Sequence, residues 1–136
     1  MLPYFVNEYK IVLIDFIFQG QSDKDGEFKN FDEHAEDVIS LRQFLQLPKA
    51  VVCGIYYGSL VAQNLSVNYP LAVEKLILLS TFAHKSEYFK AIELSWQRAV
   101  EMGGYNMLLD IMLPYVLGEN YFENHIIPIS ILIASR

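Results

Sequence analysis

The sequence is poor in several residue types, and each shortage excludes a class of protein. Cys53 is the only cysteine, so an internal disulfide is excluded and a reducing compartment such as the cytoplasm is expected. Lysine and arginine together number 10 against 16 aspartates and glutamates, which gives a formal net charge of −6. No basic stripe exists to attract phosphate groups, so nucleic acid is not an expected partner.

Long apolar runs and metal-ligand patterns are also missing. The longest apolar run, residues 126–134, is interrupted by Pro128 and is far shorter than the roughly 20 residues that span a bilayer. The first residues carry no positive charge, so neither a signal peptide nor a membrane partner is expected. Three scattered histidines and one cysteine match no metal-ligand spacing, and we expect no metal or other cofactor.

Hydrophobic residues, in contrast, are abundant. They make up 53% of the 136 residues, whereas charged residues make up 19%, below the usual share of about 25%. A complete domain can bury such an excess, but a partial domain exposes it and tends to associate. The composition therefore suggests self-association or completion by another chain.

Three apolar segments have the composition of strands. Residues 11–16, 50–54 and 75–80 are rich in β-branched and aliphatic side chains, a pattern typical of strands buried on both faces. The segments between them have hydrophobic residues at helical spacing. The predicted order of strand, helix, strand, helix and strand indicates an α/β fold with a parallel βαβαβ core.

The helices of this core have clear boundaries. Asn30 and Glu33 are spaced as a capping box, and the helix that they begin ends before Pro48. The second helix follows Gly58 and ends at Pro70. Beyond Thr81 the sequence predicts a helix over 87–102 that is stopped by Gly103-Gly104, and then a helix over 106–117 that is bent or broken at Pro114. A turn over 118–124 and a closing segment over 126–133 follow.

The turn between the second predicted strand and its helix carries the most specific signal. It reads Gly54-Ile55-Tyr56-Tyr57-Gly58, in which the two glycines have the spacing of a G-x-S-x-G turn. Such a turn exposes its central side chain at the tip, and here that side chain is Tyr56. A phenol without a base or an acid beside it is a weak nucleophile, so we expect Tyr56 to be inert.

Four segments in the right order resemble the α/β-hydrolase family. They are the loop over 15–23, the turn with its continuation to Gln63, the strand over 73–80 and a helical region over 82–136 that resembles the family's cap. The resemblance implies a partial hydrolase core over residues 1–81 and a cap-like region over 82–136. It also implies that the Tyr57 amide is an oxyanion donor.

Several parts that the resemblance calls for are missing. Tyr56 stands at the position of the nucleophilic serine, and no oxyanion loop, catalytic acid or catalytic histidine follows the family pattern. In this family a further strand lies between those that resemble 11–16 and 50–54. Without that strand, three arrangements are possible. The segments 11–16 and 50–54 pair directly, or another segment such as 126–129 lies between them, or a gap between them exposes backbone hydrogen-bonding groups.

Other candidate residues have structural interpretations. Ser59 lies about one helical turn beyond Tyr56 and is expected to pack within its helix, and Cys53 is expected inside a buried strand. His34 is expected on an exposed helix face, His84 near the mouth of a pocket, and His125 carries no signal. The resemblance suggests an apolar pocket lined by the two tyrosines and by cap residues, namely Phe82, His84, Phe89 and Trp96.

Three functional hypotheses remain. The first is a truncated or degenerate hydrolase of ester-type ancestry that does not catalyse alone. The second is a non-catalytic subunit that binds a small apolar or ester-like ligand, or that is completed by self-association or a partner chain. The third is an enzyme assembled from two chains, which Tyr56 disfavours because a second chain cannot restore the missing serine hydroxyl.

Overall fold

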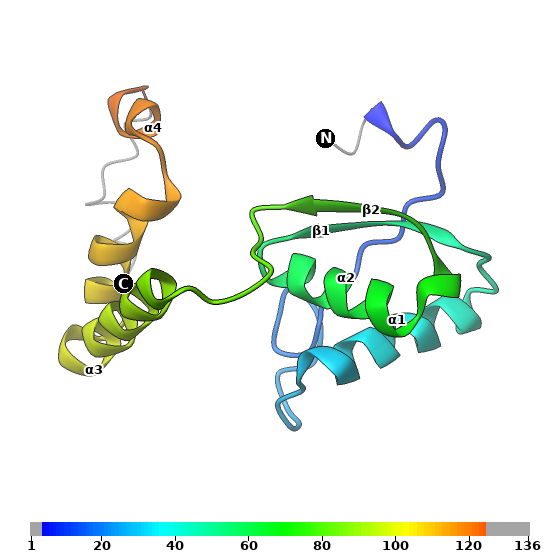
Figure 1. The fold of residues 1–136 in the computed structure, drawn as a ribbon, viewed down its shortest axis with the longest axis horizontal. Coiled ribbons are helices and arrows are strands. Elements are labelled where there is room, and N and C mark those ends of the chain that lie inside the picture. The colour runs from blue at the N-terminus through cyan, green and yellow to red at the C-terminus, as the bar shows by residue number, and fades with distance from the viewer. Residues whose placement is uncertain (1–3, 125–136) are drawn as a thin grey trace. The chain divides into compact units, whose positions relative to one another are not determined.

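The structure, a computed structural model, describes residues 4–124. The chain divides into two compact units, Met1–Phe82 and Ala83–Arg136 (Figure 1). The elements of the first unit are α1 (Phe31–Phe44), β1 (Ala50–Ile55), α2 (Tyr57–Asn68), a short 3-10 helix (Pro70–Ala72) and β2 (Val73–Leu79).

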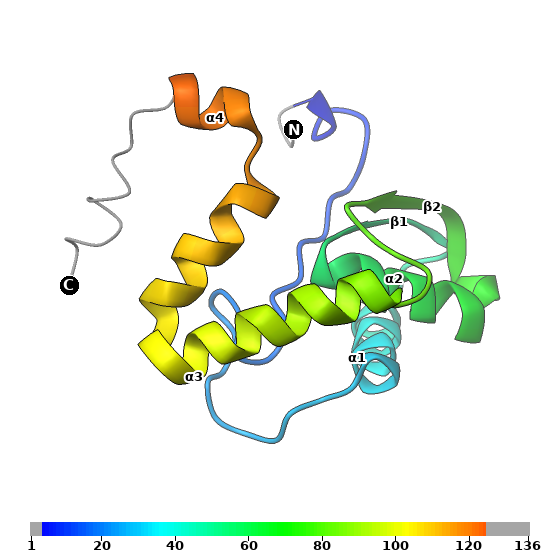
Figure 2. The ribbon, with the colours of Figure 1, turned by 60° about the vertical axis from the view of Figure 1, so that its left-hand side comes forward.

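The two strands pair in parallel, with Val51 beside Lys75 and Ile55 beside Leu79. Because α2 connects parallel neighbours, the unit is a βαβ crossover preceded by α1. Both helices lie on the same side of the strands (Figures 1 and 2). The α/β class with parallel strand pairing, predicted from the sequence, is confirmed.

The capping box predicted at the start of α1 is confirmed. The Asn30 side chain accepts hydrogen bonds from the amides of Asp32 and Glu33, and the Glu33 carboxylate accepts from the Asn30 amide at 2.7 Å. These bonds satisfy amides that have no acceptor inside the helix. The helix ends at Phe44, slightly before the boundary that Pro48 predicted.

The core of the first unit is small and lies between the helices and the strands. Its buried hydrophobic side chains are Ala35, Val61, Ala62, Leu65 and Ala72. Polar contacts at the surface reinforce the pairing of the helices, because the Asp32 carboxylate accepts hydrogen bonds from the side chains of Asn64 and Asn68.

Two sequence predictions about the sheet are wrong. Residues 11–16 form no strand, and within residues 4–124 the sheet has only two strands. The strands are also not buried on both faces, since Val51, Cys53, Ile55 and Ile77 are exposed. Strand pairing and two-sided burial both need neighbouring segments, and the described part of the first unit provides helices on one face only.

The second unit is helical, as the sequence predicts. Ser86 caps α3 (Glu87–Val116), which contains a break where Gly104 adopts φ 67° and ψ −161°. The helix continues through Pro114, where a bend or break was predicted. Residues 119–124 form the short helix α4 (Glu119–Asn124) rather than a turn, and the segment 126–133 lies outside the described residues.

Among residues 4–124, no helix combines the length and the hydrophobicity needed to cross a membrane.

Candidate functional site at the turn between β1 and α2

The turn at Tyr56 is sharp, and hydrogen bonds hold both the amide and the carbonyl of Tyr56. Tyr56 lies between the last residue of β1 and the first residue of α2, with φ 50° and ψ −118°. Its amide donates to the Leu79 carbonyl at 3.1 Å, and its carbonyl accepts from the Ser59 amide at 2.9 Å. A positive φ strains any residue other than glycine, so these bonds hold an unfavourable conformation in place.

The two glycines of the turn have different roles. A Cβ atom at Gly54 would lie 2.5 Å from the Gly58 carbonyl oxygen and 2.5 Å from the Ser59 Cα. A Cβ atom at Gly58 would meet nothing within 4 Å. Gly54 is therefore needed for the close approach of α2 to β1, whereas Gly58 has open space around it.

The side chain at the tip of the turn is isolated. Tyr56 is 56% exposed, and within residues 4–124 no hydrogen bond reaches its hydroxyl. Ser59, the nearest hydroxyl along the helix, is fully buried and donates to the Tyr56 carbonyl. Ser59 therefore packs within the helix, as predicted, and its oxygen does not face the open end of the turn.

Tyr57 begins α2, and its ring packs in an aromatic cluster. Ring centroids lie 5.2 Å away at Phe31, 5.7 Å away at His34 and 6.4 Å away at Phe16. Burial of the phenol raises the pKa of Tyr57 above its ordinary value. The Tyr57 amide belongs to the first turn of a helix, where amides lack intrahelical acceptors.

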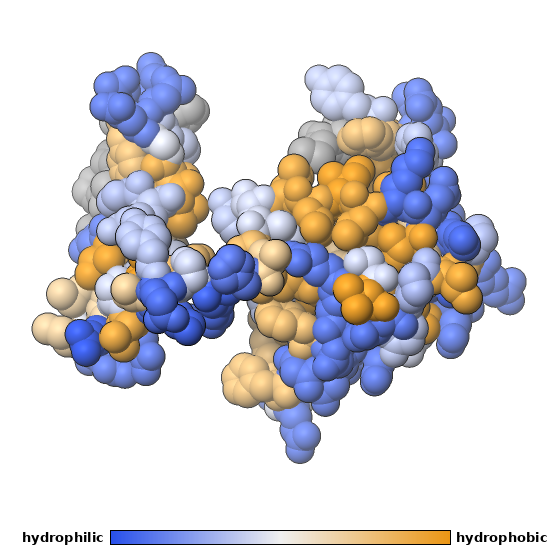
Figure 3. Space-filling model, in the orientation of Figure 1, coloured by the Kyte–Doolittle hydropathy of each residue, from blue (hydrophilic) through white to orange (hydrophobic). Residues whose placement is uncertain are grey.

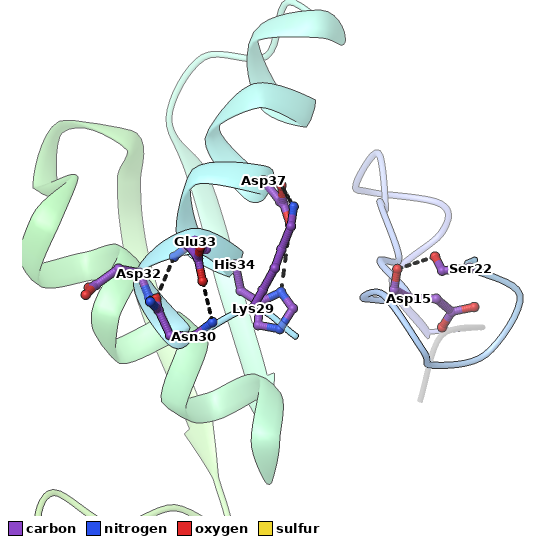
Figure 4. A network of polar contacts seen from close by, with 8 residues as sticks. All are labelled: Asp15, Ser22, Lys29, Asn30, Asp32, Glu33, His34 and Asp37. Carbon is purple, nitrogen blue, oxygen red and sulfur yellow. Dashed lines mark hydrogen bonds and ion pairs between the residues drawn. The ribbon is translucent and has the colours of Figure 1, made fainter. Parts of the chain in front are cut away.

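His34 lies inside this cluster, and its expected place on the surface is wrong. It is only 3% exposed, and its ring centroid is 4.5 Å from that of Phe16. Its Nδ1 atom makes no hydrogen bond and lies 3.8 Å from a carboxylate oxygen of Asp37, which Lys29 binds at 2.7 Å (Figure 4). The spacing of Phe31, His34 and Val38 as i, i+3 and i+7 was the signal for burial.

The loop after residues 11–16 is organised by Asp15. Its carboxylate accepts from the Gln21 amide at 2.9 Å, and its carbonyl accepts from the Ser22 hydroxyl at 2.5 Å (Figure 4). Gly20 has φ 45°, and a Cβ atom there would lie 2.1 Å from the Asp15 carboxylate. The Asp15 carboxylate therefore has a structural role, and it makes no hydrogen bond to the Tyr56 hydroxyl.

The predicted pocket residues are distributed over both units. Phe82 lies in the first unit, whereas His84, Phe89 and Trp96 lie in the second. His84 is exposed, and the side chains of Phe89 and Trp96 are half-buried. A shared pocket of these residues stays a prediction, and His125 lies outside the described residues. Among residues 4–124, no three histidine, cysteine or carboxylate side chains gather as a metal site.

A hollow of about 620 Å³ lies beside the turn. Its walls are the segment 10–16 and β1, and side chains of α1 and α2 also line it. Tyr56 and Tyr57 belong to the lining at the end of β1. In chemical terms, the first unit has a strained turn, an unactivated phenol and an apolar hollow.

The chain is similar to known proteins over most of its length. The family described as alpha/beta hydrolase fold matches residues 1–104. A 3-oxoadipate enol-lactonase 2 of Acinetobacter baylyi is 31% identical over 86 residues, covering 63% of this chain and 32% of the relative. The AB hydrolase superfamily protein YisY of Bacillus subtilis is 34% identical over 89 residues, covering 61% of this chain and 33% of the relative.

A plant receptor is a more distant relative. The Karrikin insensitive 2 receptor B of Petunia hybrida is 25% identical over 101 residues, covering 69% of this chain and 37% of the receptor. The chain spans about a third of the length of these curated relatives. No solved structure matches.

Proposed function

Because the chain belongs to the α/β-hydrolase fold family, we propose that its turn between β1 and α2 is a nucleophile elbow without a nucleophile. In this proposal the chain is a degenerate hydrolase of ester-type ancestry that does not catalyse alone. The observation that carries it is Tyr56, which occupies the strained tip of the turn with φ 50°. A nucleophile elbow needs such a strained residue with its side chain exposed.

The surroundings of Tyr56 support inactivity. A phenol is a weak nucleophile unless a neighbouring base removes its proton. Within residues 4–124 no side chain hydrogen-bonds the Tyr56 hydroxyl. The Tyr57 amide can serve as one oxyanion donor in this proposal, but one donor without a nucleophile and a base provides little rate enhancement.

Ester-type ancestry has further support in the name of one relative, an enol-lactonase. In this proposal residues 82–136 are a cap-like region. The single thiol of Cys53 supports a cytoplasmic location, because a reducing compartment keeps thiols free.

An esterase assay tests the proposal. The full chain, Tyr56→Phe and Tyr56→Ser are incubated with p-nitrophenyl acetate, and release of p-nitrophenol is compared with buffer. We expect no turnover from any of the three, because serine alone restores neither the base nor the oxyanion loop. A kcat/KM of about 10⁴ M⁻¹s⁻¹ that survives Tyr56→Phe would refute the proposal.

A second candidate function is a non-catalytic binding subunit. The hollow of about 620 Å³ supports it, because its size suits a small apolar or ester-like ligand. The open edge of β1 and the exposed hydrophobic side chains support the version completed by self-association or a partner chain. A hydrolase assembled from two chains is the third candidate, and turnover by Tyr56→Ser with supplied flanking segments would favour it.

A further inference from the structure

The chain passes from the first unit to the second over residues 80–86. The boundary lies between Phe82 and Ala83, and no helix or strand includes this stretch. Within residues 4–124, no backbone–backbone hydrogen bond involves residues 81–85. Side-chain contacts therefore decide which of these residues are tied to the first unit and which to the second.

Gln63 holds the end of the first unit. Its side-chain nitrogen, on α2, donates to the Thr81 hydroxyl at 2.6 Å and to the Phe82 carbonyl at 3.3 Å. Two residues earlier, the Leu79 carbonyl accepts from the Tyr56 amide at 3.1 Å. The chain beyond β2 is therefore fastened to α2 and to its turn as far as residue 82.

Lys85 and Ser86 hold the start of the second unit. The Lys85 ammonium lies 2.8 Å from both carboxylate oxygens of Glu93 on α3, and the Ser86 hydroxyl accepts from the Phe89 amide at 3.2 Å. Residues 85 and 86 are thus tied to the first two turns of α3. The ion pair is the weaker of these ties, because its side chains are 46% and 54% exposed and water screens their attraction.

Ala83 and His84 lie between the two sets of contacts. Both are exposed, and within residues 4–124 neither makes a hydrogen bond, an ion pair or a ring contact. Neither has a positive φ, so no backbone strain fixes their conformation. The φ and ψ angles of these two residues can therefore change without breaking any of the contacts on either side.

We propose that Ala83 and His84 are a hinge at which the second unit changes its orientation while each unit keeps its own structure. Hinges are a few residues at the ends of elements that absorb changes in φ and ψ. Gln63 limits this hinge on one side, and Lys85 limits it on the other. The proposal goes beyond the proposed function and does not depend on whether Tyr56 is inert.

The composition of the chain suits a direct test by energy transfer. Trp96, in the second unit, is the only tryptophan, and Cys53, in the first, is the only cysteine and is exposed. Time-resolved energy transfer from Trp96 to an AEDANS dye on Cys53 of the full chain gives the distribution of distances between the units. Measurement at two concentrations separates transfer within one chain from transfer between chains.

A reference within the second unit gives the width expected without a hinge. It is the variant Cys53→Ser with Tyr115→Cys, because Tyr115 lies on α3 with Trp96 and is 62% exposed. We expect the distribution between the units to be broader than that of the reference.

Proline at both hinge positions should narrow the distribution toward the reference. Neither amide has an acceptor among the described residues, so Ala83→Pro with His84→Pro removes no hydrogen bond and restricts φ at both positions. Circular dichroism checks that the variant is folded.

Gln63 is a positioning residue in this proposal, because it acts through Thr81 and Phe82. Gln63→Leu removes both of its hydrogen bonds to them, so the hinge lengthens and the distribution should broaden further. Gln97→Leu is the matched control, since the Gln97 side chain donates to Glu101 at 3.1 Å within α3. This comparison keeps the test decisive if the proline variant does not fold.

Three results would overturn the proposal. They are a distribution for the unsubstituted chain as narrow as the reference, a folded double-proline variant of unchanged width, and equal widths for Gln63→Leu and Gln97→Leu. The esterase assay is independent of these measurements. Turnover by the full chain together with a broad, proline-sensitive distribution would refute the inactive elbow and leave the hinge intact.

Discussion

At the scale of single residues, two adjacent tyrosines have different environments. The Tyr56 side chain is 56% exposed, and its hydroxyl has no hydrogen-bond partner within the described chain. Tyr57 is 38% exposed and packs against Phe31, His34 and Phe16. Burial raises the pKa of Tyr57 above its ordinary value. The residue in the nucleophile position therefore faces solvent, and its neighbour anchors the start of α2.

The raised pKa of Tyr57 predicts a pH dependence of stability. The folded chain keeps this proton at pH values where the unfolded chain, with a pKa of about 10, loses it. The contribution is present in full below about pH 10 and is lost as the pH rises through the folded pKa. Tyr57→Phe should therefore remove part of the fall in unfolding free energy between about pH 9 and pH 11.

Urea unfolding at a series of pH values measures this effect, and Tyr56→Phe is the matched control. The control should keep the pH dependence of the unsubstituted chain. Identical pH profiles for the two variants would show that the environment of Tyr57 does not favour its protonated form.

At the scale of elements, helix boundaries follow local chemistry and strand pairing does not. The capping box of Asn30 and Glu33 and the break at Gly104 both occur where the sequence predicts them. The apolar segment 11–16 has the composition of a strand but joins no ladder in the described chain. Helix caps need residues a few positions apart, whereas a strand needs a partner from elsewhere.

The turn between β1 and α2 predicts opposite outcomes for its two glycines. Gly54→Ala places a Cβ atom 2.5 Å from backbone atoms and should lower the unfolding free energy by about 1–3 kcal/mol. Gly58→Ala meets open space within α2 and should leave stability unchanged or raise it by up to about 1 kcal/mol. Urea unfolding measures the unfolding free energy of both variants, provided that their m-values equal that of the unsubstituted chain. Equal losses at the two positions would contradict this geometry.

At the scale of the molecule, hydrophobic surface remains exposed on the first unit. In Figure 3 it gathers over the strands. Gly54 faces α2, so side chains on the other face of the sheet include Val51, Ile55 and Ile77, which are 42%, 48% and 47% exposed. An apolar face of this kind favours association with another surface.

We expect the chain to self-associate through this face as its concentration rises. Ile77→Lys places a charge in the middle of the face and should shift the association to higher concentration in sedimentation experiments. Val67→Lys is the matched control, because Val67 is 77% exposed on α2 and lies away from the face. A monomer at all concentrations, or equal effects of the two substitutions, would argue against this interface.

Much of the fold and part of the site could be predicted from the sequence. The strand-helix-strand order, the capping box, the break at Gly104 and the position of Tyr56 in the turn are local patterns. Each depends on residues within about one turn or one strand of each other, so spacing and residue type suffice. Ser59 also belongs to this group, because its hydrogen bond is to the adjacent turn.

Only the tertiary structure decided which surfaces are covered. His34 is buried because Phe16 and Tyr57, from distant parts of the chain, enclose it. Cys53 is exposed because no helix in the described part of its unit covers that face of the sheet. The segment 11–16 is unpaired for a similar reason, since no neighbouring strand lies beside it in the described chain. Burial and pairing depend on long-range packing, which local spacing does not specify.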